Sequence, residues 1–287
     1  MIETTASKSF AATKGDFKER RSFHNPLVWL NLVCLDAPVV AISWLWLFAR
    51  SFGIPIAPGG AAALFLTAWF VYLADRFGDN LSLDRTTSTS LRQRFCRQHL
   101  TAWLIVLLLV GVADLLVVLT RLDPRTRVLG AAVAVFAFAY LCVNQLAPVI
   151  WRWLPLKEIC IGFLFTAGVL TPLAPGLASA GTLPWFLFAS LCSLNCLSIA
   201  VWERGLDLAQ DRVSAATTFP TVARLLLPMT VAVCLTSCVI GSTELALSAA
   251  LLAALQIGNK IQPDVRTALA DLVLLTPIAT LMSHLRG

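Results

Sequence analysis

The sequence predicts an all-α, polytopic membrane protein, a helical bundle of about nine transmembrane helices. The first observation is composition: 58% of the 287 residues are hydrophobic, only 13% are charged, and the mean hydropathy is +0.79. A soluble domain carries about a quarter charged residues, so this chain cannot cover a water-facing surface. The second observation is a series of apolar stretches close to the ~20 residues that cross a bilayer core as helix. The third is that no stretch alternates with the period of a transmembrane barrel.

Nine apolar stretches are the predicted spans, and the second and eighth are short. They are Pro26–Phe48, Gly59–Leu73, His99–Thr120, Val128–Ile150, Leu156–Leu173, Leu183–Trp202, Val222–Gly241, Leu245–Ile257 and Val265–Ser283. Residues 1–25 are mixed in charge, and no short apolar stretch with a small-residue cleavage site follows them. We therefore expect a cytoplasmic N-terminal tail over 1–25 and a single transmembrane domain over 26–287.

The distribution of basic residues predicts the orientation. If the N-terminus is cytoplasmic, most of the 22 Lys and Arg residues lie on that side, and the Arg121–Arg127 loop is the main exception. The net charge of +6 is then explained by basic loops that face anionic lipid, not by a nucleic-acid surface. We expect a multi-pass protein of the inner cell membrane. Cys96 is the only one of the eight cysteines that we expect in a polar loop.

Two acidic clusters follow the second and sixth predicted spans. Asp75 and Asp79 are four residues apart, and the second cluster repeats this step twice through Glu203, Asp207 and Asp211. Residues at i, i+4 and i+8 stay on nearly one face of a helix. Both clusters lie at the cytoplasmic ends of their spans by the orientation above.

Carboxylates stacked on one helix face repel each other, so two such rows need a reason. Mg²⁺ prefers hard oxygen ligands, uses one or two carboxylates and bridges readily to phosphate oxygens. Two rows that face each other across a cavity could therefore hold a magnesium diphosphate. The alternative is that these acids are solvated loop residues paired with Arg76, Arg204 and Arg212.

These residues resemble those of the UbiA superfamily of intramembrane prenyltransferases, over nearly the whole chain. The family places acid motifs after spans two and six, the first reading Asn-Asp-x-x-Asp-x-x-x-Asp and the second being of an Asp-x-x-x-Asp type. The second motif fits here, whereas Val71 and Tyr72 stand where the first has Asn and Asp. The resemblance implies two four-helix repeats plus one helix, Mg²⁺ as cofactor, and prenyl transfer from an allylic diphosphate to an aromatic or other lipophilic acceptor.

The resemblance also implies roles for individual residues. The expected metal ligands are Asp75, Asp79, Glu203, Asp207 and Asp211. Lys157, which opens the fifth span, resembles the basic residue that the family places beside the diphosphate. The expected catalytic set is Asp75, Asp79, Asp207, Asp211 and Lys157, and the expected ligand-binding set is Lys157, Arg212, Tyr72 and Asn195.

Two other classes of function stay open. A catalytically impaired relative that only binds isoprenoid lipid is favoured by the altered first motif. A small secondary transporter is favoured by the repeat, although the two acid rows lie at membrane ends and not at the midplane. Asp36 and Asp114 fall inside predicted spans, and intramembrane acids are functional candidates by default.

Overall fold

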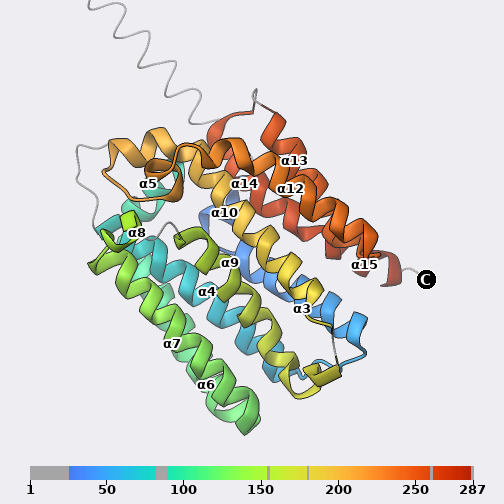
Figure 1. Cartoon of the computed structure of the whole chain (residues 1–287). Coiled ribbons are helices and arrows are strands. Elements are labelled where there is room, and N and C mark those ends of the chain that lie inside the picture. Colours follow the sequence, from blue (N-terminus) through green and yellow to red (C-terminus); the bar gives the residue numbers. More distant parts are fainter. Residues whose placement is uncertain (1–25, 82–88, 154–155, 180, 259–260, 286–287) are drawn as a thin grey trace, which may run out of the picture.

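The computed structural model describes residues 26–81, 89–153, 156–179, 181–258 and 261–285, and within these ranges the chain is all-helical without strands (Figure 1). The expected tail over 1–25 lies outside the described residues. The elements are α2 (Pro26–Leu32), α3 (Asp36–Phe52), α4 (Pro58–Leu81), α5 (Leu91–Gln98), α6 (Leu100–Arg121), α7 (Pro124–Leu146), α8 (Ile150–Trp153), α9 (Lys157–Leu170), η1 (Thr171–Ser179), α10 (Leu183–Ala209), α11 (Ala215–Thr218), α12 (Val222–Val239), α13 (Thr243–Ile257), α14 (Pro263–Leu272), η2 (Val273–Leu275) and α15 (Thr276–Leu285).

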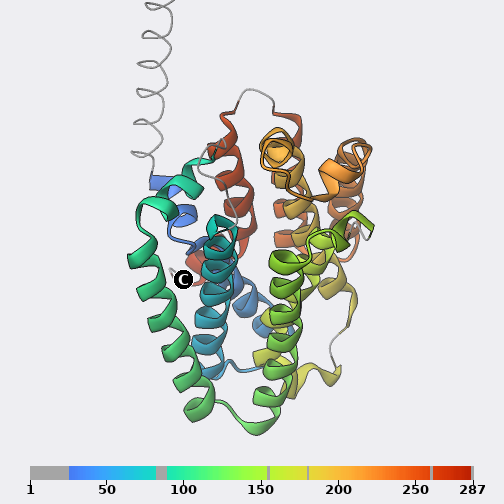
Figure 2. The same ribbon diagram turned by 90° about the vertical axis from the view of Figure 1, so that its left-hand side faces the viewer.

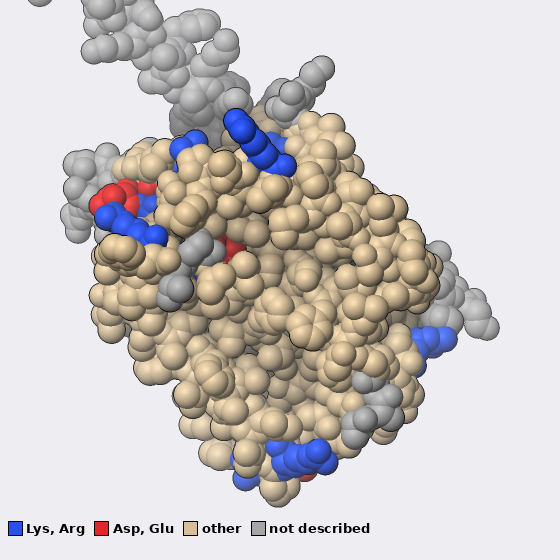
Figure 3. Space-filling model, viewed as in Figure 1, with Lys and Arg blue, Asp and Glu red and all other residues tan. Residues whose placement is uncertain are grey.

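The predicted helical membrane bundle is confirmed at the level of helix length and apolarity. Seven of the described helical segments are long and apolar enough to cross a bilayer. In the view of Figure 3, Lys, Arg, Asp and Glu gather mainly toward two opposite ends, and a broad uncharged band lies between them. The first and eighth predicted spans correspond to α3 and α13, which have 17 and 15 residues. The count of nine spans and the two repeats therefore stay predictions.

The first predicted span is interrupted. The backbone at Cys34 has φ 58°, in the left-handed region, so α2 ends before it and α3 begins at Asp36. The Asp36 Oδ1 atom accepts a hydrogen bond from the Ala37 amide at 3.0 Å, close to the start of the new helix. The interruption places Asn31 and Asp36 on two separate helices that meet inside the bundle.

The main core is a cluster of buried side chains contributed chiefly by α3, α10 and α13, with further members from α9 and α12. The rings of Trp44 and Phe188 stack at 4.3 Å, and both side chains are fully buried. The indole nitrogen of Trp44 donates a hydrogen bond of 2.7 Å to the carbonyl of Leu274, so this large ring is buried without an unpaired polar atom.

Helix α9 lies against α10 at a glycine. A Cβ atom on Gly162 would lie 2.3 Å from the Ser193 Oγ atom and 2.6 Å from its backbone nitrogen. Only glycine permits this approach. The contact fixes α9 along α10 and so fixes the position of Lys157, the first residue of α9.

Helix α5 forms a short lid at one end of the bundle. It begins with a capping box, in which the Ser90 hydroxyl and the Gln93 side chain each accept from the other residue's backbone amide. The expectation that Cys96 lies in a polar loop is wrong, because its side chain is buried in α5 at 1% exposure. Burial raises the pKa of the Cys96 thiol to about 11.

Candidate functional site

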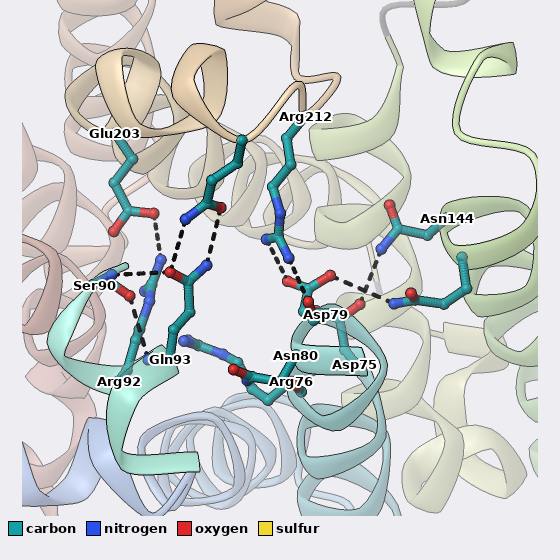
Figure 4. Close-up of polar contacts among 12 residues, drawn as sticks. Asp75, Arg76, Asp79, Asn80, Ser90, Arg92, Gln93, Asn144, Glu203 and Arg212 are labelled. Atoms are coloured by element: carbon teal, nitrogen blue, oxygen red, sulfur yellow. Dashed lines mark hydrogen bonds and ion pairs between the residues drawn. The ribbon is translucent and has the colours of Figure 1, made fainter. Parts of the chain in front are cut away.

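The carboxylates of Asp75 and Asp79 lie one turn apart near the end of α4 and face the end of α7. The Asn144 side-chain amide donates to Asp75 at 3.2 Å, and the Gln145 amide donates to Asp79 at 3.4 Å. Figure 4 shows Asn144 reaching these acids from the side opposite α5. Each of these α4 acids therefore accepts a hydrogen bond from a side-chain amide of α7, and each keeps further lone pairs.

Arg212 joins this pair of acids to the end of α10. Its guanidinium donates to the Asp79 carboxylate at 2.8 Å and to the Asp79 carbonyl oxygen at 2.9 Å (Figure 4). The geometry follows from how α10 ends. The Arg212 amide bonds the Asp207 carbonyl at 2.8 Å, and the Asp211 amide bonds the Leu208 carbonyl at 3.3 Å. This is a Schellman ending, with Asp211 at φ 51° in the position usually held by glycine.

The same ending corrects the sequence-based arrangement of the second acid row. Helix α10 stops at Ala209, so Asp211 does not continue the face of Glu203 and Asp207. The Asp211 side chain is 95% exposed and lies 3.4 Å from the Arg152 guanidinium. The prediction that all three acids share one helix face is wrong for Asp211, because the left-handed backbone turns its side chain outward.

Asp207 and Lys157 complete a group that we name the α4–α10 cluster: Asp75, Asp79, Lys157, Asp207 and Arg212. The Asp207 carboxyl group is hydrogen-bonded to the Ser214 side chain. Lys157 and Arg212 each interact electrostatically with both Asp75 and Asp207. Asp75 on α4 and Asp207 on α10 are therefore both influenced by the same two cations.

The loop that carries Arg212 is supported by a buried acid. Glu158, 4% exposed, accepts a hydrogen bond of 3.0 Å from the Ala215 amide at the start of α11. Its position next to Lys157 ties the beginning of α9 to the segment after α10. This support was not predicted, because a Glu beside a Lys at a span boundary is typical of a solvated helix end.

Glu203 interacts electrostatically with Asp207 of the α4–α10 cluster, but its hydrogen-bond and ion-pair partners lie elsewhere. Its carboxylate forms an ion pair with Arg92 and accepts a hydrogen bond of 3.3 Å from Thr267. A second contact joins the lid helix to the end of α10. The side-chain amides of Gln93 and Gln210 each donate to the other's oxygen atom, at 3.2 and 3.0 Å (Figure 4). The Glu203 carboxylate, which the sequence suggested as a metal ligand, is therefore paired with Arg92 of α5.

Tyr72 and Asn195 also lie outside the α4–α10 cluster. The Tyr72 hydroxyl accepts from Arg76 at 3.0 Å, and the Arg76 guanidinium lies 4.9 Å from the centre of the Tyr72 ring. The Asn195 amide donates to Asp271 at 3.0 Å. Both residues face a second polar group in the bundle interior.

We name that second group the interior acid pair, Asp36 and Asp271. One amide nitrogen, Nδ2 of Asn31, donates to Asp36 at 2.7 Å and to Asp271 at 3.0 Å. Asp36 is 2% exposed, and Arg76 interacts electrostatically with both acids. Asp271 was missed from the sequence, although it lies in the ninth predicted span and could have been found by the reasoning that singled out Asp36.

The α4–α10 cluster contains the residue types that could bind a magnesium diphosphate. Carboxylates are the hard oxygen ligands that Mg²⁺ uses, one or two at a time, and Lys157 and Arg212 supply charge for phosphate oxygens. Within the described part of the chain, no group of three or more His, Cys, Asp or Glu residues is arranged to hold a metal by itself. A metal here would therefore need ligand oxygens to complete its coordination. Comparisons with protein-family models, curated proteins and solved structures gave no match.

Proposed function

We propose that this chain is a membrane prenyltransferase that moves a prenyl group from an allylic prenyl diphosphate to an aromatic or other lipophilic acceptor, with Mg²⁺. The observation that supports this most is the α4–α10 cluster. It gathers carboxylates and cations from three helices and a loop at one end of an apolar bundle. An anionic head group would lie at that end, while an apolar chain would lie among the helices.

The residues of the cluster have separate tasks in this proposal. Lys157 and Arg212 bind the diphosphate oxygens, and Asn144 and Gln145 hold the two α4 carboxylates in place. As the bond between prenyl C1 and oxygen breaks, its electron pair leaves with the diphosphate. The two cations stabilise this growing negative charge. A new bond then forms between C1 and the acceptor, and the acceptor loses one proton.

Mg²⁺ would be held by one or two of the carboxylates of Asp75, Asp79 and Asp207, and when bound it would neutralise the leaving diphosphate. Because Arg212 pairs with Asp79 in this structure, substrate binding requires the guanidinium to exchange the carboxylate for phosphate oxygens. An arginine suits this exchange, since its planar fork binds either group in the same geometry.

Two alternatives are each favoured by a specific observation. Tyr72 pairs with Arg76 and leaves the α4 row one acid short, which favours a protein that binds a prenyl diphosphate without turning it over. The interior acid pair favours a small secondary transporter, because Asn195 and Asp271 lie near the middle of two candidate spans and buried acids there mark ion pathways.

The test is pyrophosphate release by the purified protein with prenyl diphosphates of several lengths, candidate acceptors and a Mg²⁺ titration. The proposal expects release that depends on both Mg²⁺ and acceptor. Binding that depends on Asp207 without turnover would favour the lipid-binding alternative. Absence of both turnover and binding would contradict the proposal. The acids would then be solvated loop residues paired with arginines.

A further inference from the structure

Helices α6 and α7 are joined by a short turn but pack on different partners. Helix α6 packs mainly along α4, whereas α7 packs on α9 and η1 and contacts α4 less extensively. Figure 2 shows α6 and α7 on either side of α4. Between them, over the first half of α4, lies a cavity of about 510 Å³, a volume typical of a small-molecule site.

The wall of this cavity is mostly apolar, and exposed leucines form part of it. Leu115 and Leu119 of α6 line it, and these side chains are 57% and 54% exposed. Two glycines of the wall, Gly130 on α7 and Gly168 on α9, leave space beside them unfilled. A Cβ atom added to Gly130 would meet its nearest neighbour, Thr171, at 3.6 Å, and one added to Gly168 would meet Leu64 at 3.9 Å.

One carboxyl group in this wall has an unused oxygen. Asp114 lines the cavity and accepts a hydrogen bond of 2.9 Å from the Thr67 hydroxyl through Oδ2. Its Oδ1 atom is buried and has no hydrogen-bond partner among the described residues. Buried polar atoms nearly always have a hydrogen-bond partner. An unpaired acceptor beside a cavity therefore indicates a ligand in the cavity that donates a hydrogen bond to it.

The charged residues of the cavity wall indicate which kind of ligand supplies that hydrogen-bond donor. Arg127 lines the same cavity and donates to the Leu122 carbonyl at 2.8 Å, and its buried Nε atom has no partner in the part of the chain that the structure describes. A positive charge in the wall disfavours a cationic ligand. A neutral hydroxyl group satisfies the Asp114 oxygen without adding charge.

We propose that this cavity binds a lipophilic alcohol or phenol taken from the bilayer, whose hydroxyl group donates to Asp114 Oδ1. The ligand enters between α6 and α7, past Leu115 and Leu119. The site lies along the first half of α4, whereas the α4–α10 cluster lies at its end, so this inference does not depend on the proposed function.

The test uses a photoreactive diazirine-bearing sixteen-carbon alcohol and its methyl ether, with the full chain in lipid nanodiscs and crosslinks located by mass spectrometry. The ether keeps the shape and apolar area but cannot donate. We expect the alcohol to label residues 111–137 about tenfold more than the ether, the discrimination typical of one hydrogen bond to a charged group. Asp114→Leu should bring the ratio to one while labelling by the ether persists.

Two matched variants on α7 complete the test. Gly130→Leu fills the cavity and should abolish labelling by both probes, whereas Ala132→Leu, exposed and outside the cavity, should leave it unchanged. Asp75→Asn should also leave it unchanged, which separates this site from the α4–α10 cluster. Equal labelling of the wild type by the two probes would overturn the proposal. So would labelling that survives Gly130→Leu, a comparison that holds even if Asp114→Leu fails to fold.

Discussion

The Asp79–Arg212 ion pair joins residues 133 positions apart in the sequence and holds the end of α4 to the loop after α10. The sequence suggested that these acids face one another and share a cation. In the structure a guanidinium of the chain itself lies among them, and Glu203 and Asp211 have basic partners of their own. At this scale the residue types of the site could be predicted, but their partners could not, because a pairing between distant residues depends on the packing of the helices that carry them.

Replacing Arg212 tests how much this pair stabilises the fold. The side chains of Arg212 and Asp79 are only 25% and 24% exposed, so Arg212→Gln leaves a partly buried carboxylate without its cation. We expect the free energy of unfolding to fall by about 1–3 kcal/mol in detergent. Arg212→Lys keeps the charge and should lose less. Equal losses in the two variants would show that shape and not charge holds the segment.

Cys96 gives a second prediction at residue scale, which concerns pH. Burial raises the pKa of this thiol from 9.0 to about 11, and only the thiolate reacts with iodoacetamide. Alkylation at pH 8 should therefore be slow in the folded protein and rapid after unfolding in SDS, as followed by mass spectrometry. Because the unfolded chain loses this proton at a lower pH than the folded protein, folding stability should fall as the pH rises from 9.0 to about 11. Equal alkylation rates at pH 8 would contradict the buried position.

At the scale of helices, the sequence predicts which segments are helical because a bilayer requires about 20 apolar residues per crossing. It does not predict where α10 ends or where the first span breaks. Both events occur at non-glycine residues with left-handed backbones, Asp211 and Cys34, and nothing in their local sequence marks them. The end of α10 directs Arg212 toward α4. The break before α3 places Asp36, one member of the interior acid pair, at the start of a helix.

The approach of α9 to α10 can be tested through two glycines on the same helix. Gly162→Ala forces a Cβ atom into the backbone of α10, so we expect a loss of at least about 2 kcal/mol in unfolding free energy. Gly168→Ala meets only ordinary contact and should be neutral or stabilising by up to about 1 kcal/mol. Thermal unfolding in one detergent compares them directly. A Gly162→Ala variant as stable as Gly168→Ala would contradict the close contact.

For the whole molecule, the lid helix, the ends of α4 and α10, and the start of α9 share one end, and the α6–α7 turn lies at the other (Figure 1). The charge bias of the sequence predicts that the first of these ends is cytoplasmic. In a cysteine-free background, Arg94→Cys should then react with an impermeant maleimide in inverted membrane vesicles. Arg125→Cys should react only after detergent is added. The reverse pattern would invert the orientation and place the α4–α10 cluster on the opposite side.

If the proposed function is right, the α4–α10 cluster binds a prenyl diphosphate through Mg²⁺. The measurement is the affinity of the purified protein for an unreactive farnesyl thiolodiphosphate, with and without Mg²⁺, in the wild type, in Asp75→Asn and in the control Asp264→Asn. We predict binding that requires Mg²⁺, weakens at least about tenfold in Asp75→Asn through the loss of a charged ligand, and is unchanged in Asp264→Asn. Binding that is indifferent to both Mg²⁺ and Asp75, or no binding at all, would contradict the claim.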